Sequence, residues 1–334
     1  MAYSTGTATD ASDLLQKLVT WLTTSRGWTA DTSVAAGSGW RATLHKGSQY
    51  VTLRAAAAAE NVSPPFGNAA TTARGIYLYG HTSYSAGAGI FAQPGFPVGY
   101  LQTYAETCGM QLGVSGYIVS YDFFDDGSDN IVVVAQKAAG VFGYLCFGPS
   151  LTKAGTWTGG AYTIGSNAGY YTQHSLAGTP SYDNTSSSCP TCPAALGSSE
   201  TTGYVRADID AFTGNWASVC YPSTEGGTLT ANTQNWTGKT VLGWAPSSVT
   251  PTSINSVPGI QYEYGAYRNQ LSSIPMLLPC RLFAVRDSGG CSVLGDLPNV
   301  FFSEAVGNGY SARDTVSIGA DTYMLFPNFA VKKV

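Results

Sequence analysis

The sequence Tyr117-Ile-Val-Ser-Tyr-Asp-Phe-Phe124, followed by Asp125-Asp-Gly-Ser-Asp-Asn130 and Ile131-Val-Val-Val134, predicts the strongest β-hairpin of the chain. Both flanking runs are rich in β-branched and aromatic residues, and the segment between them is made of residues that favour turns. The turn offers carboxylate oxygens of the kind that calcium binds, but the spacing of an EF-hand and its closing Glu are missing. We therefore interpret this segment as a hairpin tip, which needs Gly and Asp for backbone reasons alone.

More strands are expected on the carboxyl-terminal side of this hairpin. Residues 141–147 predict a further strand, and the turn-rich stretch Trp157-Thr-Gly-Gly-Ala-Tyr162 extends the hairpin into a meander. Three apolar runs near the end of the chain also predict strands, and these are Arg281-Leu-Phe-Ala-Val-Arg286, Val300-Phe-Phe302 and Asp321-Thr-Tyr-Met-Leu-Phe326. No helical period competes with them, and no internal repeat is evident.

A single amphipathic helix is expected on the amino-terminal side. Asp10 or Ser12 can cap it, and Gly27 supplies the left-handed residue at its end. Its apolar residues recur at helical spacing, at Leu14, Leu15, Leu18, Trp21 and Leu22. We expect Leu18 and Trp21 to face a sheet that includes Leu44 and Leu53.

A β-hairpin follows the helix. Trp40-Arg-Ala-Thr-Leu-His45 and Tyr50-Val-Thr-Leu-Arg54 flank Lys46-Gly47, and their apolar positions alternate. From about residue 60 to residue 110 the chain is rich in Gly, Ala, Pro and Ser, with one short strand predicted at Ile76-Tyr-Leu-Tyr79.

These elements predict a β-rich α+β fold in which the helix packs on an antiparallel sheet. Residues 1–172 form the helix and β-meander module, and residues 271–334 form a carboxyl-terminal β segment that completes the core. Residues 173–270 are rich in Ser, Thr, Asn, Gly and Pro, with only short apolar islands such as Thr240-Val-Leu-Gly-Trp244. We interpret them as a long, loop-rich insertion rather than as a second core.

The composition argues against an enzyme. Only 11% of the 334 residues are charged and three are His, whereas there are 40 Gly, 21 Tyr, 13 Phe and 7 Trp. Histidine and clustered carboxylates are the usual proton-transfer groups, so their scarcity lowers the expectation of catalysis. Tyr, Trp, Gly, Ser and Asn are typical of contact surfaces. The sequence therefore favours a non-enzymatic part of an assembly that needs no cofactor.

Charge and hydropathy argue against other classes of partner. The net charge of −4 and the scattered Lys and Arg residues give no basic surface for direct binding of nucleic acid. No apolar run is long enough to span a membrane, and residues 1–10 lack the features of an ordinary signal peptide. We expect neither a membrane partner nor export by such a signal.

Candidate catalytic motifs have simpler explanations. Gly238-Lys239-Thr240 ends like a phosphate-binding loop, but Thr233 stands where the first Gly must be. No Gly-x-Ser-x-Gly motif occurs, and no His lies in a triad-like pattern. Three acidic residues are available for a glycosidase carboxylate pair, but nothing in the sequence brings two of them together; they are Asp183, Glu225 and Glu263.

Four of the seven cysteines are informative, and they are of two kinds. Cys146 and Cys280 lie in apolar, strand-like surroundings and are expected to be buried and reduced. Cys189 and Cys192 form a CxxC pair in a Ser-rich segment, where a thiol can meet another chain. A zinc site is disfavoured because no second CxxC follows. A local disulfide, a disulfide between subunits and two free thiols all remain open for this pair.

Both ends of the chain resemble a known class of proteins. The opening Ala8-Thr-Asp-Ala-Ser-Asp-Leu-Leu-Gln-Lys-Leu18 with Gly27-Trp28, and then Gly39-Trp40 and Tyr50-Val-Thr-Leu-Arg54, resemble virion proteins encoded in the neck and tail modules of tailed bacteriophages. The carboxyl-terminal part shows the same resemblance through Leu278-Pro279, Phe283, Arg286, Leu294-Gly295, Pro298, Val316-Ser-Ile-Gly-Ala-Asp-Thr-Tyr323 and Phe326-Pro327. The Ser- and Cys-rich middle departs from it.

Within that class the sequence looks most like collar or collar-sheath proteins. This resemblance implies a protein of the virion, made and assembled in the bacterial cytoplasm, that forms a homo-oligomeric ring matching the sixfold tail and contacts other neck or tail proteins. A baseplate or receptor-binding protein that holds host glycan on Tyr- and Trp-rich loops is the alternative. A virion-associated wall hydrolase is a third reading, and it requires a carboxylate or zinc site that the sequence does not show.

Overall fold

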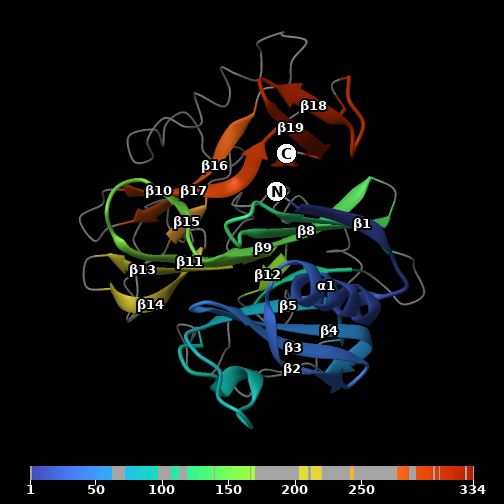
Figure 1. The fold of residues 1–334 in the computed structure, drawn as a ribbon, viewed down its shortest axis with the longest axis vertical. Helices are drawn as coiled ribbons and strands as arrows, with labels where there is room; N and C mark the ends of the chain where they lie inside the picture. Colours follow the sequence, from blue (N-terminus) through green and yellow to red (C-terminus); the bar gives the residue numbers. More distant parts are fainter. Residues whose placement is uncertain are drawn as a thin grey trace, which may run out of the picture.

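The computed structural model describes residues 2–61, 72–96, 107–112, 119–138, 140–165, 167–169, 203–209, 212–219, 241–243, 277–285, 291–303, 305–307, 309–327 and 329–333. In these ranges the chain forms two sheets, paired almost entirely antiparallel, and one α-helix (Figure 1). The predicted β-rich α+β class is therefore confirmed.

The smaller sheet has six strands in the order β12-β6-β5-β4-β3-β2. Their bounds are β2 Thr29–Ala36, β3 Gly39–Lys46, β4 Gln49–Asn61, β5 Thr72–His81, β6 Thr107–Gln111 and β12 Asn167–Gly169. The predicted hairpin around Lys46-Gly47 is confirmed as β3 and β4, and the predicted strand at residues 76–79 lies inside β5. A short 3-10 helix, η1 Ile90–Ala92, follows this strand.

The larger sheet has fourteen strands in the order β1-β7-β8-β9-β11-β13-β14-β15-β16-β17-β20-β19-β18, with β10 paired to β17. Its first strands are β1 Ala2–Ala8, β7 Val119–Asp125, β8 Ile131–Ala138, β9 Val141–Gly148, β10 Thr152–Lys153 and β11 Thr158–Gly165. The others are β13 Gly203–Ile209, β14 Phe212–Val219, β15 Val241–Gly243, β16 Leu278–Val285, β17 Cys291–Phe302, β18 Thr315–Ile318, β19 Asp321–Phe326 and β20 Phe329–Lys332. The predicted meander and carboxyl-terminal strands are present.

Helix α1 spans Ala11–Ser25 and begins and ends as its sequence predicts. The Asp13 backbone N–H donates to Oδ1 of Asp10 at 2.9 Å, which makes Asp10 the N-cap. Gly27 has φ of 71°, and the backbone N–H groups of Arg26 and Trp28 both donate to the Leu22 carbonyl. The helix therefore turns sharply into β2. No helix of the described ranges is long and apolar enough to cross a membrane.

The β7-β8-β9 meander is buried on both faces. One set of its alternating side chains joins the core formed by α1 and the smaller sheet, and it consists of Tyr121, Phe123, Ile131, Val133, Ala135, Leu145 and Phe147. The opposite set joins a second core, shared with strands β11, β17, β19 and β20, and it consists of Phe124, Val132, Val134, Tyr144 and Cys146. Burial on both sides explains why the run at residues 131–134 is continuously apolar instead of alternating. Figure 1 shows the meander, in green, between the blue smaller sheet and the orange and red carboxyl-terminal strands.

Some strands of the described ranges were not predicted from the sequence. Residues 173–270 were interpreted as a loop-rich insertion, and strands β13, β14 and β15 lie within this range and belong to the larger sheet. Strands β1 and β2 were not predicted because their residues are small and polar, and their placement depends on the neighbours β7 and β3.

Candidate functional site

Strand β7 carries a buried aspartate on each face, and the first of these is Asp122. Its Oδ1 accepts a hydrogen bond from the Tyr3 hydroxyl at 2.7 Å, and its Oδ2 lies 2.8 Å from Nε of Arg313. Burial, and then the hydrogen bond donated to Asp122, raise the pKa of Tyr3 to about 12, so the phenol keeps its proton. The side chain of Asp122 is fully buried, whereas that of Arg313 is partly exposed.

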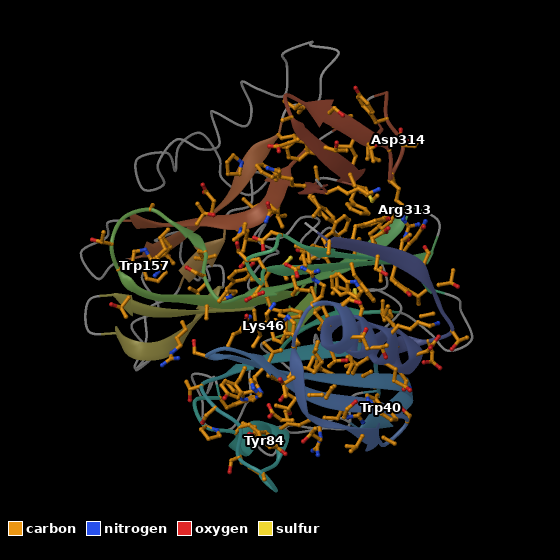
Figure 2. All side chains as sticks on the ribbon, in the orientation of Figure 1. Trp40, Lys46, Tyr84, Trp157, Arg313 and Asp314 are labelled. Carbon is orange, nitrogen blue, oxygen red and sulfur yellow. The ribbon has the colours of Figure 1, made fainter. Side chains whose placement is uncertain are left out.

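Arg313 is held in position by its backbone and by two further contacts. Its φ of 71° places it in the left-handed region, in a turn that Asp314 closes by accepting the Ser311 N–H at 2.7 Å. Nη1 of Arg313 donates to Oε1 of Gln136 at 2.7 Å, and its guanidinium carbon lies 5.4 Å from the centre of the Phe142 ring. Figure 2 shows Arg313 beside Asp314, where the carboxyl-terminal strands approach the meander.

Asp125 lies on the opposite face of β7 and binds the end of helix α1. Its Oδ2 is 2.5 Å from Nε of Arg26, the residue that ends the helix, and its Oδ1 accepts the Gly127 N–H at 2.7 Å. Lys46 reaches the same region, because its Nζ donates to the Arg26 carbonyl and pairs with Asp129, each at 2.5 Å. The hairpin tip is therefore joined to both α1 and the β3-β4 hairpin.

Asp126 joins the same tip to the carboxyl-terminal strands. Its two oxygens accept the Ser128 N–H at 2.7 Å, the Asn130 side-chain amide at 2.8 Å and the Asn299 side-chain amide at 2.8 Å. The carboxylates of the tip are thus engaged by donors of the chain itself. No group of three or more His, Cys, Asp or Glu side chains within the described ranges is arranged to hold a metal ion.

The two histidines that the structure describes lie on the smaller sheet. Nδ1 of His45 is 2.8 Å from Oδ2 of Asp31, and its ring stacks on Tyr50 with centroids 5.0 Å apart. The pairing register of β2 with β3 shifts between residues 30 and 32, and a bulge of this kind aims Asp31 at the imidazole. The His45–Asp31 pair is a cross-strand contact between β3 and β2.

His81, at the end of β5, is 2% exposed and packs on Phe96 with ring centroids 6.0 Å apart. Neither ring nitrogen has a hydrogen-bond partner within the described part of the chain. Burial lowers the pKa of His81 to about 4, so the imidazole is neutral at neutral pH. The unfolded chain takes up a proton at this histidine at a higher pH than the folded protein does, so acid destabilises the fold.

A compact loop, residues 82–96, covers His81 and reaches β2. The buried Gln93 side chain holds it together by accepting the Ser85 N–H at 2.9 Å and donating to the Ala88 carbonyl at 3.0 Å. The Tyr84 hydroxyl lies 2.7 Å from the Thr32 hydroxyl of β2. Figure 2 shows Tyr84 and Trp40 at the end of the molecule formed by the smaller sheet.

The residues singled out from the sequence have different outcomes. Cys146 and Cys280 are buried, as predicted. Cys189 and Cys192 lie outside the described residues, as do His174, Asp183, Glu225, Glu263 and the Gly238-Lys239-Thr240 triplet. Sequence reasoning missed the pairs Arg26 with Asp125 and Arg313 with Asp122, because 99 and 191 residues separate their members.

No protein-family model matches this chain, and no curated protein matches it significantly.

Proposed function

We propose that this chain is a non-enzymatic structural protein of a tailed-phage virion, where it forms part of the neck or collar at the head-tail junction. Its partners are further copies of itself, in a ring around the tail terminator or sheath, and the adjoining neck or tail proteins. The resemblance of residues 1–60, 117–165 and 277–334 to neck and tail proteins supports this assignment.

The main support for this proposal is that the charged side chains around β7 pair with one another across the layers of the fold. Asp122 and Asp125 extend from the two faces of β7. Asp122 binds Arg313, in the turn before β18, and Asp125 binds Arg26, at the end of α1. Asn299 and Lys46 bind the hairpin tip from the same two sides. These groups link the layers at defined positions, and loss of one partner would leave a buried charge unpaired, which suits a structural part of a particle better than a catalytic site.

The test is to locate the protein in purified particles. Gold-labelled antibody against the purified chain, followed by electron microscopy, should mark the neck, and native mass spectrometry of the released ring should give a stoichiometry compatible with the sixfold tail. Label at the baseplate, with trimers that bind host glycan, would favour the receptor-binding alternative. Particles without any label would refute both assignments.

A further inference from the structure

Strand β2 is an open edge of the smaller sheet. It pairs with β3 on one side, and no strand of the described ranges pairs with its other side. Residues 32–36 of this strand carry no charge and no Pro. Val34 is 42% exposed and is the one large hydrophobic side chain of the described residues that is classed as exposed. An uncharged edge of this kind is a template for pairing with another strand.

The other edge strands of the described sheets are less available. β12 has three residues and β18 has four. β1 is longer, but the carbonyl of Thr7 near its end already accepts a hydrogen bond from Nζ of Lys17 at 2.7 Å. Short strands and covering side chains are common ways to prevent pairing at an edge. β2 has neither over residues 32–36.

The turn beside β2 determines which of its backbone groups point outward. Ala36 and Gly39 are register partners across a two-residue turn, so they form a hydrogen-bonded pair. Hydrogen-bonded and non-hydrogen-bonded pairs alternate along an antiparallel ladder. Ser33 and Ala35 are therefore in non-hydrogen-bonded positions relative to β3, and they direct their N–H and C=O groups to the open side.

We propose that β2 pairs antiparallel with β2 of a second copy of this chain, about a twofold axis that passes beside Val34. In this register Val34 lies opposite Val34 of the partner subunit, and Ser33 lies opposite Ala35 of the partner subunit. The outward groups of Ser33 and Ala35 then form the hydrogen bonds of the new ladder. The two valines occupy a non-hydrogen-bonded position, where facing side chains are closest.

A second copy suits this edge because the strand is complementary to itself. Every facing pair between residues 32 and 36 combines small or apolar side chains, and no charge faces a like charge. Asp31, the one charged residue of β2, lies at the bulge outside the paired segment and binds His45. A twofold pair also uses the open edges of both copies, so the contact closes and does not propagate into a filament.

The neighbouring loop extends this contact beyond the strand. Tyr84 binds Thr32, and Thr32 and Val34 point to the same face of the sheet because side chains alternate along a strand. Tyr84 therefore lies beside the proposed twofold axis. A strand pair alone buries less than the roughly 800 Å² per partner of a standard interface, and an aromatic loop on the same face adds to the buried area.

The inference goes beyond the proposed function. A twofold contact through β2 does not depend on a position in the virion. In a ring it would either group six subunits as three dimers or join two stacked rings. A monomeric protein would not change the expected antibody labelling at the neck. Labelling elsewhere in the particle would not argue against the dimer.

Sedimentation velocity of the purified full-length chain, from about 1 to about 100 µM, tests the contact. The wild-type protein should sediment at twice the 34.9 kDa mass of the chain at the higher concentrations. Val34→Lys places two ammonium groups opposite each other, and Ala35→Pro removes an outward N–H that the monomer does not use. Each variant should weaken dimerisation at least tenfold. Ser317→Lys, at an exposed position of edge strand β18, is the matched control and should dimerise like the wild type.

Circular dichroism of each variant separates loss of the contact from loss of the fold. If Ala35→Pro does not fold, Val34→Lys decides alone, because residue 34 is exposed and tolerates a long polar side chain. A wild-type protein that stays monomeric over the whole range refutes the proposal. Dimers, or any larger oligomers, that persist undiminished in Val34→Lys refute it as well.

Discussion

Arg313 and Asp122 form an ion pair whose energetics differ from those of a surface pair. The fully buried Asp122 carboxylate loses its hydration. The Arg313 guanidinium and the hydrogen bond from Tyr3 compensate for that loss. The pair as a whole adds little net stability, but removal of one member leaves an unpaired buried charge. Arg313→Ala should therefore lower the free energy of unfolding by roughly 3 kcal/mol, near the lower end for such pairs because Tyr3 still donates to Asp122. Urea denaturation of both proteins measures this difference.

The pair formed by Lys332 and Asp321 provides the control. Its atoms are 2.7 Å apart, similar to the buried pair, but the Asp321 side chain is 38% exposed. Water screens such a pair, so Lys332→Ala should change stability by less than about 1 kcal/mol. Equal losses in Lys332→Ala and Arg313→Ala would show that burial of Asp122 does not determine the cost.

His81 makes the stability of the fold depend on pH. In the folded protein its pKa is about 4, below the ordinary value of 6.5, so the unfolded chain takes up the proton first as the pH falls. The contribution of His81 to the free energy of unfolding should be constant above about pH 6.5. Between pH 6.5 and pH 4 protonation of this residue should lower the free energy of unfolding by up to roughly 3 kcal/mol. The measurement is the free energy of unfolding at several pH values in that window.

His81→Phe separates this contribution from that of the acidic residues. Phe keeps an aromatic ring against Phe96 and cannot be protonated. The variant should lose less stability than the wild type between pH 6.5 and pH 4, while both should behave alike above pH 7. Parallel curves over the whole range would mean that the buried imidazole does not remain neutral as described.

Helix α1 contributes to the core mainly through one row of leucines. Leu18 is fully buried against the smaller sheet, whereas Trp21 is partly buried and packs on Phe123 with centroids 5.5 Å apart. Leu18→Ala should cost about 2 to 5 kcal/mol, and Trp21→Ala should cost less than the roughly 3 to 5 kcal/mol typical of a core Trp. Thermal unfolding of the two variants checks which loses more stability.

Thr24→Ala, on the exposed face of the helix, is the control. Its free energy of unfolding should differ from that of the wild type by less than about 0.5 kcal/mol, and a larger loss would contradict this assignment of faces.

Local signals predicted the elements whose sequences determine their own structure. The Asp10 cap, the leucine spacing and Gly27 define α1, and turn residues between apolar runs define the hairpins β3-β4 and β7-β8. β1 and β2 lack such signals because their residues are mostly small and polar. They become strands by completing ladders beside β7 and β3. Strands β13 and β14 were missed because their sequences contain Gly, Asp and Asn, which are rare in strands.

At the scale of the whole molecule, the two faces of the meander pack into two different cores. Its apolar side chains belong to one core or the other by simple alternation, so their burial was predictable from the sequence. The sequence predicted Asp122 only as part of a strand and Asp125 only as part of a turn. Their partners come from the two ends of the chain, and pairing over such separations leaves no local pattern. The candidate site was therefore not predictable, although the strand that carries it was.

The cysteines are expected to differ in their exposure to oxidising conditions. In the proposed role as a phage protein, the chain would fold in a reducing cytoplasm, where thiols stay free, and the particle would meet oxidising conditions after lysis. Cys146 and Cys280 are shielded by complete burial. Cys189 and Cys192 lie in a Ser-rich segment outside the described residues, and they remain the predicted sites of oxidation.

A disulfide between neighbouring copies through Cys189 or Cys192 would lock the assembly after folding is complete, and it would slow dissociation without hindering assembly. Purified particles, denatured in the presence of a thiol-blocking reagent and run without reductant, should show a covalent multimer of this chain. Reductant should convert that band to the 34.9 kDa monomer. Replacement of both residues by Ser should abolish the multimer while particles still assemble, because the bond forms afterwards. Migration as a monomer without reductant would leave a local bond or free thiols and would end the locking role.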